Sequence, residues 1–170
     1  MTCITPPLLA EAIFEFERMC TQSQLRLGDE IFAQQPTLLG AILVLKRFGA
    51  NDAQIGIALH VLCVAWLAMK RYEVQKGLKW PVISERVFGQ CMQRLTARAN
   101  FIEGLTSDLQ HQAVKQQTDA HEERYLIAFA LGHLRDNGVL NIQNEAEKQV
   151  VLSTLCIVEC IAVSAPHKGH

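Results

Sequence analysis

The residues that most suggest chemistry lie between positions 108 and 125, in a stretch rich in Gln and His. Asp108 and His111 are three residues apart, so a helix would place a carboxylate and an imidazole one turn from each other. The same three- and four-residue spacing continues beyond them. We therefore expect a polar stripe along one side of a helix, formed by Asp108, His111, Lys115, Thr118, Glu122 and Tyr125.

A metal site is one interpretation of this stripe. Carboxylate-bridged di-iron bundles use a related Glu-x-x-His spacing, but they use it twice and add two further glutamates. The sequence holds no second copy of the spacing. We favour a hydrated helix surface that protrudes from the bundle or meets another subunit, and we expect no metal there.

Histidine and cysteine also recur at helical spacing elsewhere. His60 and Cys63 are three residues apart, and Cys156 and Cys160 are four apart. If their helices were neighbours, the four side chains could surround a tetrahedral zinc ion. The spacing is not that of a zinc finger, and the surrounding residues are apolar, so buried inert thiols are the favoured interpretation. Six cysteines without a C-x-x-C pair, in a chain able to build a core, predict reduced thiols and a cytoplasmic location.

Glu159 interrupts an otherwise apolar stretch. It could mark the exposed edge of a helix. If it is buried, it needs a cation or hydrogen-bond donors, which His60 or an arginine could supply. A buried Glu159 would be the best single candidate for a shifted pKa and hence for function.

Charge divides the chain into three sectors. The formal net charge is −1, but residues 1–45 carry −3, residues 46–98 carry +6 and residues 99–170 carry −4. The basic sector includes a stripe of arginines at four-residue spacing, preceded by two lysines. We predict a partner-binding surface formed by Arg86, Arg94, Arg98, Lys76 and Lys79. The alternative is a solvated face that balances neighbouring acids; with so few aromatic residues, nucleic acid is an unlikely partner.

The elements that carry these residues are predicted to be helices, because apolar residues recur every three or four positions and nothing alternates at period two. We expect an all-α, irregular bundle with apolar central helices, in a single domain over residues 1–165 and a disordered tail over 166–170. About six helices are expected, at 7–20, 37–48, 52–75, 82–103, 107–135 (with a break in the middle) and 144–164, with a shorter piece at 28–35. Residues 53–69 are apolar enough to approach the lower limit of a membrane span, but their flanks favour a buried helix, and we expect no membrane insertion.

Function is less constrained than fold. Phosphate-binding glycine loops, Gly-x-Ser-x-Gly, His-Glu-x-x-His and Gly-x-Gly-x-x-Gly are missing from the sequence. We expect a non-catalytic intracellular protein that acts through protein contacts as a regulator or adaptor, with self-association as a homodimer and no cofactor. One alternative is a binding module for a small apolar ligand or a metal, in a cavity lined by the helices at 52–75 and 144–164. Another is a helical enzyme that uses His111, His121 or Glu159 as acid or base.

Overall fold

The computed structural model describes residues 2–166, and these contain eight α-helices, one 3₁₀ helix and no β-strand. The predicted all-α class is confirmed, with more helices than the six or so expected. Residues 167–170, most of the tail predicted to be disordered, lie outside the described residues. The elements are α1 (Pro6–Arg18), α2 (Thr21–Gln34), α3 (Pro36–Leu43), η1 (Val44–Phe48), α4 (Asp52–Lys76), α5 (Glu85–Glu103), α6 (Ser107–Ala120), α7 (Arg124–Asp136) and α8 (Glu145–Val163).

The extra helices have two local causes. α2 has a weak apolar periodicity and buries only Leu27 and Ile31. The sequence therefore predicted only a short helical piece at 28–35, which corresponds to its second half. The long helix expected at 107–135 is two helices, α6 and α7. At His121 the backbone leaves the helical conformation and becomes extended, with ψ of 138°. The Glu123 N–H donates a hydrogen bond to His121 Nδ1 at 3.0 Å.

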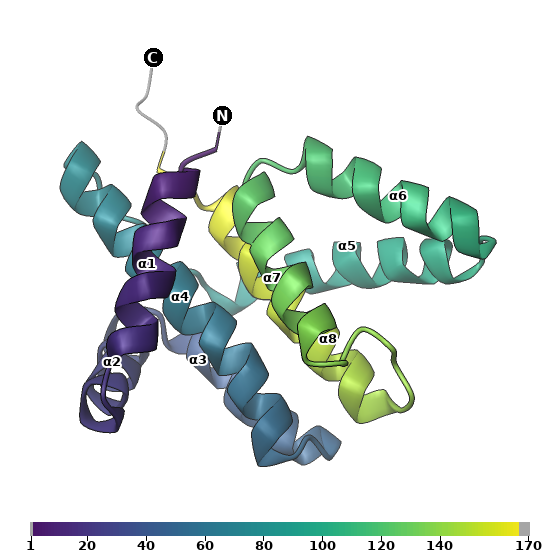
Figure 1. The fold of residues 1–170 in the computed structure, drawn as a ribbon, viewed down its shortest axis with the longest axis horizontal. Helices are drawn as coiled ribbons and strands as arrows, with labels where there is room; N and C mark the ends of the chain where they lie inside the picture. The colour runs from purple at the N-terminus through teal and green to yellow at the C-terminus, as the bar shows by residue number, and fades with distance from the viewer. Residues whose placement is uncertain (1, 167–170) are drawn as a thin grey trace.

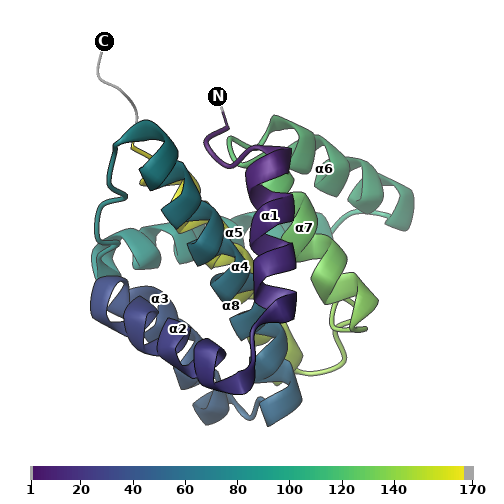
Figure 2. The ribbon, with the colours of Figure 1, turned by 60° about the vertical axis from the view of Figure 1, so that its left-hand side comes forward.

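The core is built around α4 and α8, which pack against each other and against most of the remaining helices (Figures 1 and 2). Nine consecutive residues of α4, 61–69, are buried, as a helix surrounded by other helices requires. Among the described residues, α4 is the one helix long and apolar enough to cross a membrane. In the most apolar part of α4, 56% of the residues are buried inside the fold. Core helices also reach this length and hydropathy, so these two properties alone do not indicate a membrane span.

Helix ends follow the predicted signals in part. Asn51 accepts a hydrogen bond from the Gln54 N–H and Asn144 accepts one from the Glu147 N–H, so both cap helices. Gly77 ends α4 with φ of 67°, a left-handed conformation that glycine adopts without steric cost. At Gly104 φ is −76°, so α5 ends in a right-handed turn instead.

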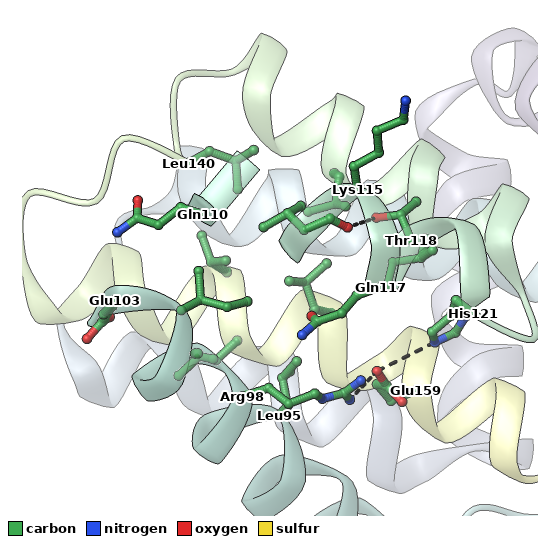
Figure 3. A pocket seen from close by; sticks show the side chains of 18 of the residues that line it. Leu95, Arg98, Glu103, Gln110, Lys115, Gln117, Thr118, His121, Leu140 and Glu159 are labelled. Atoms are coloured by element: carbon green, nitrogen blue, oxygen red, sulfur yellow. Dashed lines mark hydrogen bonds and ion pairs between the residues drawn. The ribbon is translucent and has the colours of Figure 1, made fainter. Parts of the chain in front are cut away.

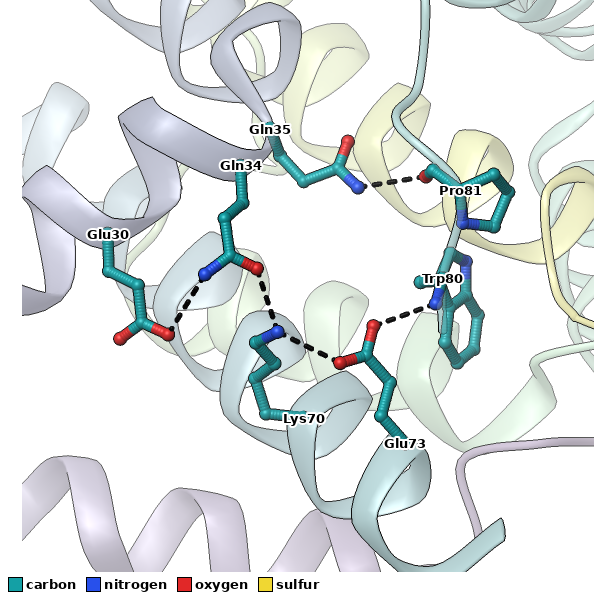
Figure 4. Close-up of polar contacts among 7 residues, drawn as sticks. All are labelled: Glu30, Gln34, Gln35, Lys70, Glu73, Trp80 and Pro81. Carbon is teal, nitrogen blue, oxygen red and sulfur yellow. Dashed lines mark hydrogen bonds and ion pairs between the residues drawn. The ribbon is translucent and has the colours of Figure 1, made fainter. Parts of the chain in front are cut away.

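The connection between α4 and α5 is held by Glu73 of α4 and by Gln35, which lies between α2 and α3 (Figure 4). Glu73 Oε1 accepts from the Trp80 N–H at 2.7 Å. The buried Gln35 donates to the Pro81 carbonyl and accepts from the Ile83 N–H, both at 2.9 Å. These bonds fix the point where α5 begins, and therefore the positions of the side chains that α5 carries.

α5 and α6 form a layer outside the α4–α8 core. Figure 1 shows α5 and α6 extending side by side away from α4, with α7 and α8 at their base. No residue of α6 is buried. α6 is therefore a cover over α5, α7 and α8 rather than part of the core.

Candidate functional site: a cavity between α5, α6, α7 and α8

A cavity of about 750 Å³ lies beneath α6 (Figure 3). Sites for small molecules are concave, mostly apolar spaces of roughly 300–1,000 Å³, so this cavity is of ligand size. Its walls come from four helices and the α7–α8 connection. The apolar lining consists of Leu95, Ala99 and Ile102 from α5, Val114 from α6, Ile127 and Leu131 from α7, Leu140 and Ile142 from the connection, and Val151, Leu152 and Leu155 from α8.

One end of the cavity is closed by three polar side chains, Arg98, His121 and Glu159, which we call the polar cluster (Figure 3). Arg98 Nη2 donates to Glu159 Oε1 in an ion pair. His121 Nε2 lies 3.5 Å from the same carboxylate oxygen. The side chains of His121 and Glu159 are only 8% and 12% exposed, whereas that of Arg98 is 37% exposed.

The tautomer of His121 follows from its second contact. His121 Nδ1 accepts the Glu123 N–H, so it carries no proton. The ring proton is then on Nε2, the nitrogen that faces Glu159. His121 is neutral in this arrangement, and the backbone bond fixes the direction in which the imidazole points.

Glu159 is ionised in this environment. Burial raises the pKa of its carboxyl group, but the hydrogen bond from His121 and the positive charge of Arg98 lower it by more, so the pKa lies below its usual value. A carboxylate that is ionised and already bonded is a poor proton donor. The cluster is therefore better suited to holding a polar group than to acid catalysis.

Two further features border the cluster. A second cavity of about 340 Å³ shares Arg98, Gln117, His121 and Glu159 with the first, so the cluster forms a polar wall between the two spaces. At the far end of the larger cavity, Lys148 Nζ lies 3.6 Å from Glu103 Oε1 in a more exposed ion pair. The larger cavity thus has one buried polar end, an apolar middle and one wet polar end.

A comparison of the chain with protein-family models, with curated proteins and with solved structures finds no match in any of the three. The site is therefore interpreted from its geometry.

The predicted polar stripe is divided between several environments. His111 and Lys115 line the larger cavity from α6. Asp108 is exposed and is not among the residues that line either cavity. Glu122 follows the end of α6 and borders the smaller cavity.

The predicted basic stripe is also divided. Arg86 and Arg94 on α5 are exposed, as are Lys76 and Lys79 around the α4–α5 connection. Arg94 Nη2 lies 3.4 Å from Cys91 Sγ on its own helix. Arg98 instead turns to Glu159, so it belongs to the polar cluster.

The histidine and cysteine pairs do not meet. His60 stacks on His133 of α7 with ring centroids 4.2 Å apart, and the edge of Phe16 approaches it at 4.9 Å. Cys156 Sγ lies 3.6 Å from the Phe88 carbonyl. All six cysteines are free, and across residues 2–166 no group of three or more His, Cys, Asp or Glu residues is placed to hold a metal ion.

Two parts of this site were not predicted from sequence. The cavity was expected between the helices at 52–75 and 144–164, but only the second of these, α8, lines it. Arg98 was expected on an outer surface and is instead the partner of Glu159, which was one of the alternatives for a buried Glu159; His60, the other candidate, is engaged with His133. A basic residue on one helix and a lone acid on an apolar helix could have been paired as a hypothesis, but spacing along the chain does not say which helices are neighbours.

Proposed function

We propose that this protein is a non-catalytic binding module for a small, mostly apolar molecule, which it holds in the cavity between α5 and α8. The observation that carries the proposal is the combination of a ligand-sized volume, apolar side chains that line it from α5, α7 and α8, and the polar cluster at one end; the wall formed by α6 is polar apart from Val114. Apolar walls provide most of the binding energy in such sites, and a few polar groups fix the orientation of the ligand.

The looseness of α6 supports this function. Because α6 buries none of its residues, it has few buried contacts to lose when it moves away from α5 and α7. A ligand could enter beneath it without disrupting the α4–α8 core. Val114 is the apolar residue that α6 contributes to the cavity wall, and it is 38% exposed. A substitution at Val114 therefore tests whether a ligand enters beneath α6.

The experiment is a titration with Nile red, a neutral apolar dye that becomes bright when it leaves water. We expect saturable binding to the intact chain. The substitution Val114→Trp would fill the cavity from α6 and weaken binding at least tenfold. The matched control is Val74→Trp, at a position on α4 that is 87% exposed and outside the cavity, and it should bind the dye like the original protein.

Two results would contradict this proposal. One is the absence of saturable dye binding to the folded protein. The other is equal affinity in Val114→Trp and Val74→Trp, which would place the dye elsewhere.

A second candidate function is protein contact through the exposed basic residues, including self-association as a homodimer. Arg86, Arg94, Lys76 and Lys79 form no salt bridge within residues 2–166, so their charges remain available to an acidic partner or an acidic surface of a second copy. Light scattering tests the homodimer, and Arg86→Glu with Arg94→Glu should abolish it. A monomer at every concentration would contradict the homodimer. The free cysteines suit a reducing compartment such as the cytoplasm.

A further inference from the structure

Resting on the proposed function, we infer the chemical class of the ligand: an apolar chain or ring with a neutral head group that both donates and accepts a hydrogen bond, such as a hydroxyl or a carboxamide. The head group would lie against Arg98 and Glu159, and the apolar part would extend along the cavity toward Leu140. Three observations support this inference: the polar cluster has no net charge, Arg98 and Glu159 keep unused hydrogen-bonding atoms, and the cavity runs from the cluster toward Leu140.

The polar cluster has no net charge to offer. Arg98 contributes one positive charge and Glu159 one negative charge, and they already form an ion pair. His121 is neutral because its Nδ1 accepts the Glu123 N–H. A charged head group placed here would lose part of its hydration without gaining a counter-charge from the cluster, which is costly.

The ion pair nevertheless leaves hydrogen-bonding capacity on both partners. Within residues 2–166, the guanidinium of Arg98 makes a single hydrogen bond, from Nη2, and its buried Nε has no partner. Both contacts to Glu159 fall on Oε1. Glu159 Oε2 and the Nη1 group of Arg98 are therefore free to take a donor and an acceptor from one ligand group.

The direction of the ligand follows from the cavity. Figure 3 shows Arg98, His121 and Glu159 gathered at one end, and Glu103, Gln110 and Leu140 at the other. The wall between them is apolar on α5, α7 and α8. The far end of the cavity, with its ion pair of Lys148 and Glu103, is open to water, so its polar groups are already hydrated. The polar head of a ligand therefore belongs at the buried cluster, and its apolar body lies along the apolar walls.

The test uses three ligands that share a ten-carbon chain: 1-decanol, decanoate and decyltrimethylammonium. Each displaces bound Nile red from the intact protein at pH 7.5, and its dissociation constant is read from the displacement curve. We expect 1-decanol to bind at least tenfold more tightly than either charged ligand.

Two variants then reverse the preference. Glu159→Gln leaves Arg98 without its counter-charge, so decanoate should become the tightest of the three ligands. Arg98→Met leaves Glu159 unpaired, so decyltrimethylammonium should become the tightest. Glu103→Gln changes the charge at the opposite end of the cavity and should leave 1-decanol first. Far-ultraviolet circular dichroism and retained Nile red binding verify that each variant is folded.

The outcomes separate the two levels of the proposal. If the three ligands bind equally, or in an order that neither Glu159→Gln nor Arg98→Met alters, the head-group inference is wrong while the cavity remains a binding site. If decanoate is tightest in the unmodified protein, the site selects an anion and the neutral-head inference is overturned. If Nile red itself does not bind, the proposed function fails.

Discussion

Two carboxylates in this protein are withdrawn from water in different ways. Glu123, 1% exposed, accepts three hydrogen bonds from the N-terminal segment: from Thr2 Oγ1 at 2.8 Å, from the Cys3 N–H at 2.7 Å and from the Ile4 N–H at 3.0 Å. Glu159 accepts from Arg98 and faces His121 through Oε1, and it lines both cavities.

The difference separates a structural role from a binding role. Glu123 joins the start of the chain to the α6–α7 connection, and every bond it makes is with this chain. Glu159 sits beside empty space and keeps bonding capacity. Buried polar groups whose partners are complete contribute to a unique fold, whereas incomplete ones next to a cavity are candidates for ligand contact.

The largest expected effect is on Glu123. Glu123→Ala would leave two buried backbone N–H groups, those of Cys3 and Ile4, without an acceptor, and should lower the free energy of unfolding by about 3 kcal/mol. Urea denaturation measures this loss. The exposed neighbour provides a matched control, since Glu122→Ala should change stability by no more than about 0.5 kcal/mol. Equal losses of stability in Glu123→Ala and Glu122→Ala would contradict the structural role of Glu123.

Glu159→Gln should cost less, about 1 kcal/mol at pH 7, because the amide retains an acceptor for Arg98 and the arginine is partly hydrated. The effect should also depend on pH. Because folding lowers the pKa of Glu159, its stabilisation is present above the unfolded pKa and is lost as pH falls through the folded one. The stability of Glu159→Gln should consequently fall less steeply than that of the original protein below about pH 4.5. Parallel acid curves would show that Glu159 is not held as described.

The stacked histidines on the other side of the core make a third test. Burial and the neighbouring His133 lower the pKa of His60 to about 4. The unfolded chain binds a proton to this residue near pH 6.5 and the folded chain does not, so stability should decrease as pH falls from about 6.5 to about 4. We expect His60→Phe to reduce this decrease by about 1 kcal/mol, because the ring is partly exposed and solvent screens its charge. Nile red binding at pH 5.5 should remain intact in His60→Phe, because His60 is not among the residues that line the cavity.

The smallest effects are expected on the basic surface. Arg94→Met and Arg98→Met remove the same charge one turn apart on α5, but only Arg98 is paired with a carboxylate. Arg94→Met should change thermal stability by no more than about 0.5 kcal/mol and leave ligand preference unchanged. Arg98→Met should lower stability further and alter the preference. Identical behaviour of the two variants would mean that the ion pair with Glu159 contributes nothing.

The sequence predicted the helices better than the site that they form. Apolar spacing and capping residues such as Asn51 and Asn144 act locally, so the class of fold and most long helices could be recognised. The break at His121 depends on one hydrogen bond between the His121 side chain and a backbone N–H two residues on, which apolar spacing does not register.

The cavity depends on tertiary packing. Its walls include apolar residues of α5, α7 and α8. The sequence pattern of these helices would be the same if they packed together without a cavity between them. His111, Lys115 and Arg98 were singled out from sequence and do border the cavity, but as parts of other predicted surfaces. Glu159 was recognised as unusual because it interrupts an apolar helix, yet its partner could not be chosen without knowing that α5 packs on α8.

The most direct test of the central claim is a methyl nuclear magnetic resonance titration of the selectively labelled protein with 1-decanol. The account predicts saturable shifts for the methyl groups of Ile102, Ile127, Leu131 and Leu155, which line the cavity, and none for Leu62 and Val64 in the centre of α4. Shifts confined to α4 and its neighbours, or no saturable shift at all, would contradict it.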